Sequence, residues 1–173
     1  MRKGEFDNEM TPQPRERKIK TAQQALQSLM RLCARSEKST GDALRLMRTW
    51  GVPEAEQHGV LEKLIANCYI DNRRYAEAYT REKSQLAGWG ERKIAMQLRL
   101  KGVEREIIGE VMALLVADDD RVERLRERLK RKLRTTKAAN DYELRGKLLR
   151  YALGLGYDYD MAKETVEEVV AEK

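Results

Sequence analysis

Proline is scarce in this sequence, and sequence patterns typical of β-strands are nearly absent. Its 173 residues include one phenylalanine and three prolines, Pro12, Pro14 and Pro53. The chain is rich instead in Leu, Ala, Glu, Lys and Arg, the residues that lose least on entering a helix. This composition disfavours a β-sheet protein and predicts an all-α fold. Because 37% of the residues are charged and 41% are hydrophobic, we expect a thin, extended architecture without a thick core.

Recognisable catalytic motifs are also absent. The single histidine, His58, stands in a polar segment without a nucleophile or acid at a recognisable catalytic spacing. No P-loop, GxGxxG or HExxH motif occurs. Residues 118–120 are three consecutive aspartates, which fit a cation site less well than favourable contacts with the N-terminal amides of a following helix. We therefore expect no enzymatic activity, no cofactor and no metal, and a surface position for His58.

Long apolar segments are missing as well. The longest apolar run, residues 111–117, is short beside the about 20 residues that a membrane helix needs. The opening stretch MRKGEFDNEM carries acids where a secretory signal would be apolar. Cys33 and Cys68 lie in apolar helical patterns without CxxC spacing, which predicts buried free thiols in a reducing compartment. These observations predict a cytoplasmic protein that does not enter a membrane.

The charge balance points to the kind of partner. The chain carries a formal net charge of +6 and has a pI near 9.3. Such a protein suits an anionic partner, which can be nucleic acid or an acidic protein surface. Charge alone does not choose between them.

Three glycines mark an internal repeat. Gly102 follows Gly51 by 51 residues, and Gly156 follows Gly102 by 54. A short apolar-faced helix is expected before each glycine, another helix after it, and a longer helix further upstream. The expected fold is an elongated, curved array of three tandem three-helix repeats, which suits a monomer. Its parts are a flexible polar tail at residues 1–20 and repeats at 21–68, 69–117 and 118–173.

Helix starts and stops agree with this division. Thr40 and Asp71 are predicted to cap the helices that follow them, and Asn140 with Glu143 forms a capping-box pattern. Each of the three glycines is predicted to end its short helix in a left-handed conformation.

The middle repeat carries a more specific pattern. It reads YIDNRRYA at residues 69–76, GWGERKI at 88–94 and LRLKGV at 98–103. In order and spacing these segments resemble the RecX family of regulators of the bacterial RecA recombinase, and the fit extends over about residues 21–171. Departures from the family pattern are ANC at residues 66–68, in place of an acidic-glycine turn, and Trp89 and Glu91 around Gly90.

The resemblance implies a non-enzymatic protein that acts in DNA recombination, DNA repair and the SOS response. It would lie in the helical groove of the RecA filament on single-stranded DNA, bridge neighbouring subunits, and inhibit or modulate the recombinase, ATPase and co-protease activities.

Basic residues in the middle repeat are the first candidates for contact with RecA or DNA. Their local surplus of positive charge can meet carboxylates or phosphates, although a solvated helix face is the alternative for any one of them. Trp89, between two glycines, is included as an exposed aromatic residue. The candidates are Arg73, Arg74, Arg81, Lys83, Trp89, Arg92, Lys93, Arg99 and Lys101.

A basic ridge in the third repeat supplies the other candidates. Its members share one helix face because they recur at i, i+3, i+7 and i+10. They are Arg121, Arg124, Arg128 and Arg131. The alternative is that the ridge pairs within the chain with the acids Glu164, Glu167 and Glu168 on the last helix.

Two other functions remain open at this stage. A stand-alone nucleic-acid-binding helical module would use the same basic faces on phosphate, and its affinity for naked DNA would fall steeply with salt. A passive helical scaffold would respond to neither DNA nor RecA.

Overall fold

The structure is a computed structural model, and it describes residues 19–118 and 120–173. The predicted tail, residues 1–20, lies outside the described residues except for Ile19 and Lys20. The described part of the chain contains nine α-helices and no strand, as predicted. The helices are α1 (Ala22–Cys33), α2 (Thr40–Thr49), α3 (Glu54–Ala66), α4 (Asn72–Gln85), α5 (Glu91–Leu100), α6 (Arg105–Val116), α7 (Asp120–Thr135), α8 (Asp141–Leu155) and α9 (Tyr159–Ala171).

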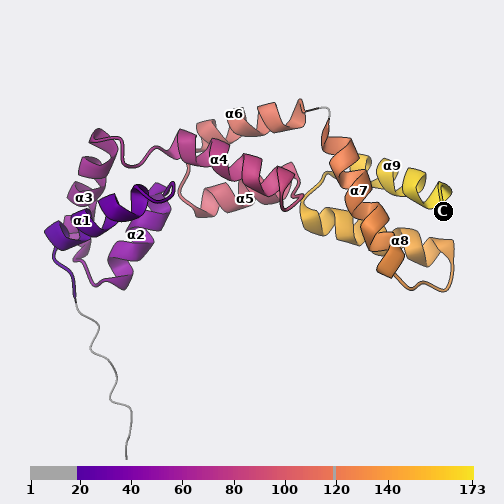
Figure 1. The fold of residues 1–173 in the computed structure, drawn as a ribbon, viewed down its shortest axis with the longest axis horizontal. Helices are drawn as coiled ribbons and strands as arrows, with labels where there is room; N and C mark the ends of the chain where they lie inside the picture. Colours follow the sequence, from indigo (N-terminus) through magenta and orange to yellow (C-terminus); the bar gives the residue numbers. More distant parts are fainter. Residues whose placement is uncertain (1–18, 119) are drawn as a thin grey trace, which may run out of the picture.

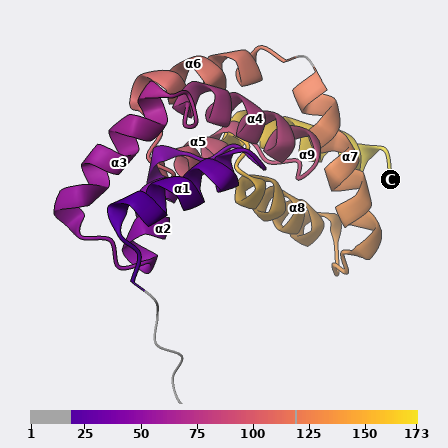
Figure 2. The same ribbon diagram turned by 60° about the vertical axis from the view of Figure 1, so that its left-hand side comes forward.

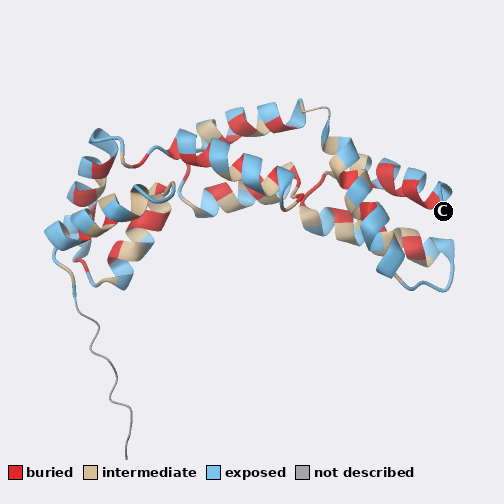
Figure 3. Ribbon diagram, viewed as in Figure 1, coloured by how far each residue is buried: buried red, intermediate tan, exposed pale blue. Residues whose placement is uncertain are grey.

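Consecutive sets of three helices each enclose a small apolar core, so we call α1–α3, α4–α6 and α7–α9 the first, second and third units. Figure 3 shows buried residues inside all three units. Truncating a fully buried Leu in such a core costs about 2–5 kcal/mol. Central side chains are Leu29, Met47 and Leu64 in the first core, Ile94, Leu98 and Val111 in the second, and Leu125, Leu148 and Val166 in the third.

The units follow one another along a bowed path, which confirms the predicted elongated, curved array (Figure 1). In the middle of the array α6 lies on the outer side and α5 on the inner side, and Figure 2 shows the same arrangement after rotation. Ile70, which the sequence placed in the second repeat, is buried in the first core. The repeat boundaries themselves stay predictions.

Neighbouring units meet through the ends of their middle helices, α2, α5 and α8; α8, with 15 residues, is longer than the short helix predicted before Gly156. The Gly41 amide in the first turn of α2 donates to the Lys101 carbonyl at the end of α5 (3.0 Å), and the Gly90 amide at the start of α5 donates to the Leu155 carbonyl at the end of α8 (2.8 Å). A Cβ on Gly90 would lie 2.5 Å from the backbone of Gly156. The middle helices therefore run head to tail through the array, with glycine where two backbones touch.

The three turn glycines have the predicted left-handed conformation, with φ of 72° at Gly51, 73° at Gly102 and 94° at Gly156. The residue before each glycine offers its carbonyl to another segment. At the N-terminal end of the array this acceptor is the Trp50 carbonyl, which accepts a hydrogen bond from the Lys20 amide at 2.9 Å. The Lys20 ammonium lies 3.6 Å from the centre of the Trp50 ring. The segment before α1 thus occupies the position that a preceding unit would fill.

Two predicted helix caps are confirmed and one is wrong. Asp71 and Asn140 accept from the amides of Arg74 (3.0 Å) and Glu143 (2.9 Å). Thr40 is not the cap of α2, because Ser39 holds that position and accepts from the Asp42 amide (3.1 Å). The Glu143 carboxylate accepts from Ala139 (2.8 Å), one residue before the Asn140 cap, so the Asn140–Glu143 pattern is not a reciprocal capping box.

The predicted burial of both cysteines is wrong for Cys68. Both thiols are free, and Cys33, the last residue of α1, is partly buried against the first core. Cys68 is exposed because it stands in the turn after α3 with a positive φ of 58°, outside the helical pattern in which the sequence placed it. Burial raises the pKa of the Cys33 thiol.

Candidate partner-binding surface

The basic ridge of α7 faces the second unit. Arg128 Nη2 donates to the Leu86 carbonyl at 2.6 Å. Arg121 Nη1 lies 3.4 Å from Glu91 Oε2, which is ion-pair distance without a hydrogen bond, and both side chains are 14% exposed. These two arginines therefore hold the second and third units together, and Arg121 presents little of its charge to solvent.

The other two members of the ridge differ in exposure. Arg124 pairs with Asp118 at 2.6 Å and is 19% exposed. Arg131 lies 3.6 Å from Glu127 on its own helix and is 61% exposed. Of the four ridge arginines, Arg131 is thus the one whose guanidinium is most available to a partner.

Acids of the last helix do pair within the chain, but with cations outside the predicted ridge. Glu167 forms an ion pair with Arg145 of α8 at 2.7 Å. Glu168 forms an ion pair with Arg126, which lies on the side of α7 opposite the ridge. The predicted alternative named the correct type of contact and the wrong partners.

Half of the basic candidates in the second unit lie within 4 Å of a carboxylate. Two pairs join neighbouring units, one joins α4 to α6 and one lies within α4, and the cations keep part of their surface in solvent. They are Arg73 with Glu110 (2.5 Å), Arg74 with Glu37 (2.6 Å), Lys83 with Glu82 (2.6 Å) and Lys101 with Asp42 (2.8 Å).

Three of the candidate arginines in the second unit are exposed and lack such a pair. Within the described residues 19–118 and 120–173, no carboxylate lies within 4 Å of Arg81, Arg92 or Arg99. Arg81 is on α4, whereas Arg92 and Arg99 are on α5. Exposed unpaired guanidinium groups of this kind can bind a carboxylate or a phosphate through two parallel hydrogen bonds.

Trp89 is only partly exposed, because its ring packs against the second core. Lys93 Nζ lies 4.4 Å and Lys83 Nζ 5.6 Å from the ring centre. Lys93 also donates to the Gly154 carbonyl of the third unit at 3.3 Å. Trp89 therefore packs within the second unit, and Lys93 contributes to the contact between the second and third units.

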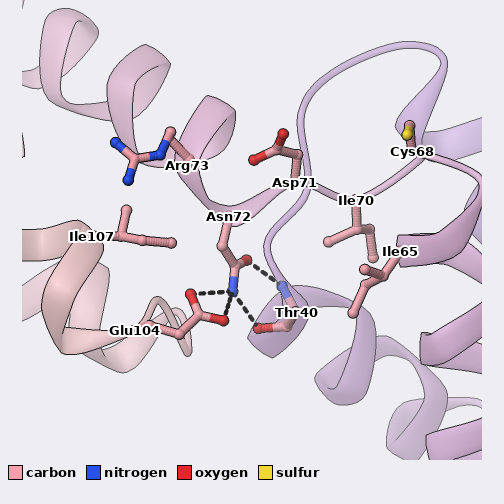
Figure 4. A pocket seen from close by; sticks show the side chains of 9 residues that line it. All are labelled: Thr40, Ile65, Cys68, Ile70, Asp71, Asn72, Arg73, Glu104 and Ile107. Carbon is pink, nitrogen blue, oxygen red and sulfur yellow. Dashed lines mark hydrogen bonds between the residues drawn. The ribbon is translucent and has the colours of Figure 1, made fainter.

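The sequence interpretation overlooked Asn72, which lies inside the YIDNRRYA pattern. Its Oδ1 accepts from the Thr40 amide at 3.0 Å, and its Nδ2 lies within 3.2 Å of oxygens of Thr40, Gly102 and Glu104. Figure 4 shows the side chains of Asn72, Thr40 and Glu104 converging between the first and second units. Asn is a weak helix former, so an Asn directly after the cap Asp71 was the available signal of a special role.

A basic groove opens beside this contact, between α2 and α5. It has a volume of about 440 Å³, and we call it the α2/α5 groove. It combines backbone glycines, two leucines and four cationic side chains. Its lining residues are Gly41, Asp42, Leu44, Arg45, Arg48, Arg99, Leu100, Lys101 and Gly102.

Asp42 is the single carboxylate among these lining residues, and it is already engaged. The residue is 6% exposed and accepts from Lys101 Nζ at 2.8 Å and from Arg45 Nη2 at 2.9 Å. Burial opposes its ionisation, but the hydrogen bonds from Lys101 and Arg45 outweigh burial and keep the pKa of Asp42 below its ordinary value. One negative charge faces four positive ones, so the groove carries a surplus of three.

Residues considered for catalysis or metal binding have simple surroundings. His58 is exposed, as predicted, and lies 3.1 Å from Glu62. Asp118 accepts from the Asp120 amide at 3.1 Å and pairs with Arg124, whose hydrogen bond lowers the pKa of Asp118. Among the helices that the structure describes, none has the length and apolar character needed to cross a membrane.

Comparisons with known proteins agree with this architecture. Residues 71–112 match the family profile "RecX, second three-helix domain", and residues 118–166 match "RecX, third three-helix domain". A crystal structure of RecX from Lactobacillus salivarius superposes with a TM-score of 0.66 at 20% identity, covering 86% of this chain and 96% of that one. A second crystal structure, of a regulatory protein RecX, gives a TM-score of 0.70 at 18% identity over 88% and 72% of the two chains. These two likenesses concern the fold.

Sequence relatives cover most of the chain. The regulatory protein RecX of Mycolicibacterium smegmatis is 29% identical over 168 residues, which is 95% of this chain and 87% of the relative. That of Mycobacterium sp. (strain KMS) is 30% identical over 147 residues, covering 83% of this chain and 80% of the relative. The predicted resemblance is confirmed, and the chain belongs to the RecX family.

Proposed function

We propose that this RecX-family regulatory protein binds the RecA filament on single-stranded DNA and inhibits or modulates its recombinase, ATPase and co-protease activities. The observation that carries the proposal is similarity, over nearly the whole chain, to proteins named regulatory protein RecX. The protein would act in the cytoplasm as a monomer, without a cofactor or chemistry of its own.

The bowed array suggests how binding could inhibit. Backbone hydrogen bonds at Gly41 and Gly90 join consecutive units directly, so the units are held in a defined order and orientation. A partner contact made by one unit then brings the other units close to their own contacts, which raises the effective concentration of each later contact. Such a protein, lying along adjacent RecA protomers, would resist the rearrangements of strand exchange and obstruct other proteins from the same groove.

Assays of RecA-dependent ATP hydrolysis and strand exchange test the proposal. We expect both rates to fall as the folded protein is added to filaments on single-stranded DNA. Thermal unfolding of the same preparation serves as the control for folding. Unchanged rates at protein concentrations equal to the RecA concentration would contradict the proposed function.

A second candidate is a stand-alone nucleic-acid-binding module, favoured by the exposed unpaired arginines such as Arg92 and Arg99. Phosphate binding by several arginines releases counterions, so affinity for naked DNA would decrease steeply with salt. Measurement of oligonucleotide binding between about 50 and 200 mM salt distinguishes this module from a filament regulator.

A further inference from the structure

The α2/α5 groove combines two features that narrow the choice of its ligand. The first is unsatisfied positive charge. Arg48 and Arg99 are exposed, and no carboxylate of the described chain lies within 4 Å of either. Arg45 and Lys101 share Asp42 as their carboxylate partner. An anionic ligand would therefore find donors on both walls of the groove.

The second feature is exposed apolar surface within the same groove. Leu100, on the α5 side, is 73% exposed, and Leu44 on the α2 side is half-buried. A sugar–phosphate backbone would satisfy the arginines but leave Leu100 in contact with water. A protein segment that carries an apolar side chain between carboxylates would satisfy both features, as interfaces rich in Arg and apolar anchors do.

The lining also lacks a platform for nucleic acid bases. None of its nine residues is aromatic, whereas proteins that bind single strands commonly stack the bases on aromatic rings. Shape favours an extended or single-turn segment, because the groove lies between the ends of two short helices that meet at Gly41 and Lys101.

We propose that the α2/α5 groove binds an acidic protein segment in which Asp or Glu residues flank an apolar side chain. The carboxylates pair with Arg48 and Arg99, and the apolar side chain covers Leu100. This inference rests on the proposed function, which makes a RecA protomer of the filament the carrier of the segment. It identifies the chemistry of one contact site, which the function itself leaves open.

Photocrosslinking from the groove tests the proposal. Leu100 is replaced by benzoylphenylalanine, and the protein is irradiated on RecA filaments assembled on single-stranded DNA with a non-hydrolysable nucleotide. We expect a crosslink to RecA that maps by mass spectrometry to a segment rich in Asp and Glu. The matched control places the same group at Leu114 on α6, which is 72% exposed and outside the groove; there we expect no crosslink to that segment.

Charge reversal supplies an independent readout. Arg99→Glu is expected to weaken filament binding on the order of tenfold, since one lost charged contact at a partly desolvated site is worth about 1.4 kcal/mol or more. The control, Arg105→Glu, changes an exposed arginine of α6 outside the groove and is expected to leave binding within about twofold.

The outcomes separate the groove from the proposed function. A crosslink to DNA, to a segment without acids, or within this chain would overturn the groove proposal. So would binding to the filament, measured by co-sedimentation, without any crosslink from position 100. Absence of filament binding by the unmodified protein would instead contradict the proposed function, and the groove proposal with it.

Discussion

Among single residues, Asn72 joins two units through a buried side-chain amide. It is 7% exposed, and its amide connects the start of α2, the turn after α5 and the side chain of Glu104. An oxygen or amide left buried without a partner costs about 1–3 kcal/mol. Asn72 therefore links the first unit to the second through hydrogen bonds that hydrophobic packing does not replace.

We predict that Asn72→Ala lowers the free energy of unfolding by about 2 kcal/mol, because the Thr40 amide loses its acceptor and the Gly102 carbonyl keeps only the Thr40 hydroxyl as a side-chain donor. Denaturant titration followed by circular dichroism measures the change. Asn67→Ala is the control: Asn67 is exposed and donates only to Lys63 (2.8 Å), so a change within about 0.5 kcal/mol is expected. Equal effects of the two substitutions would exclude the proposed role of Asn72.

Asp42 gives the protein a defined response to acid. The folded state holds the pKa of Asp42 below its unfolded value of about 4. Its contribution to stability is therefore present above about pH 4 and lost as the pH falls toward the folded pKa. We predict that Asp42→Asn unfolds at lower denaturant concentration than the wild type at pH 6, and that the difference shrinks at pH 3. A constant difference across this range would contradict the sign of the shift.

The roles of single residues were predictable from the sequence where a local rule applied, as at the helix caps Asp71 and Asn140. Ser39 and Thr40 both carry a capping hydroxyl, so the sequence could not decide between them. Tertiary contacts decided, because Thr40 is used by Asn72 and Gly102 of the next unit. Asn72 escaped prediction for the same reason: its partners lie 30 and 32 residues away.

At the scale of helices, the end-to-end contacts of α2 with α5 and of α5 with α8 explain why glycine occurs on both sides of each contact. Gly41 lies against the Lys101 carbonyl, and Gly90 lies against Gly156. A methyl group at either position would push the units apart. Gly59, in the exposed part of α3, has no neighbour within 4 Å of an added Cβ.

Alanine substitutions at Gly41 and Gly59 should change the free energy of unfolding in opposite directions. We predict that Gly41→Ala lowers stability by about 1–3 kcal/mol through overpacking against Lys101. Gly59→Ala should raise stability by about 0.5–1 kcal/mol, since alanine loses less entropy in a helix. Unfolding midpoints of both variants provide the test, and a stabilising Gly41→Ala would contradict the close approach of α2 and α5.

The ridge of α7 illustrates a limit of helical periodicity. Spacing predicted correctly that Arg121, Arg124 and Arg128 share a face. It could not show that this face meets the second unit, because the relevant acceptors, such as the Leu86 carbonyl, come from another segment. The same spacing of arginines along a helix is expected for a surface that binds a partner and for an interface within the chain.

We predict that Arg128→Ala lowers the free energy of unfolding by about 1 kcal/mol, the typical value of one hydrogen bond. Arg131→Ala should change it by less than about 0.5 kcal/mol, because Arg131 is exposed and its pair with Glu127 is weak. Thermal unfolding compares the two proteins. If Arg128→Ala kept full stability, Arg128 would be better explained as a contact for a partner.

For the whole molecule, the repeat of 51 and 54 residues predicted the number of helices, their grouping and the curved array. The α2/α5 groove was not predictable, since Arg48 belongs to the first unit and Arg99 to the second, far apart in the sequence. Only the contact between units brings them into one groove. A surface that spans units is thus a property of the array, which fits a protein that binds an extended partner.

The proposed function requires that this protein binds the RecA filament more tightly than it binds the single-stranded DNA alone. Binding of the purified protein is measured on filaments assembled on single-stranded DNA with a non-hydrolysable nucleotide, and on the same DNA without RecA, at two salt concentrations. We predict clear preference for the filament at both concentrations. Equal or tighter binding to naked DNA, lost at the higher salt concentration, would contradict a filament regulator and favour a nucleic-acid-binding module.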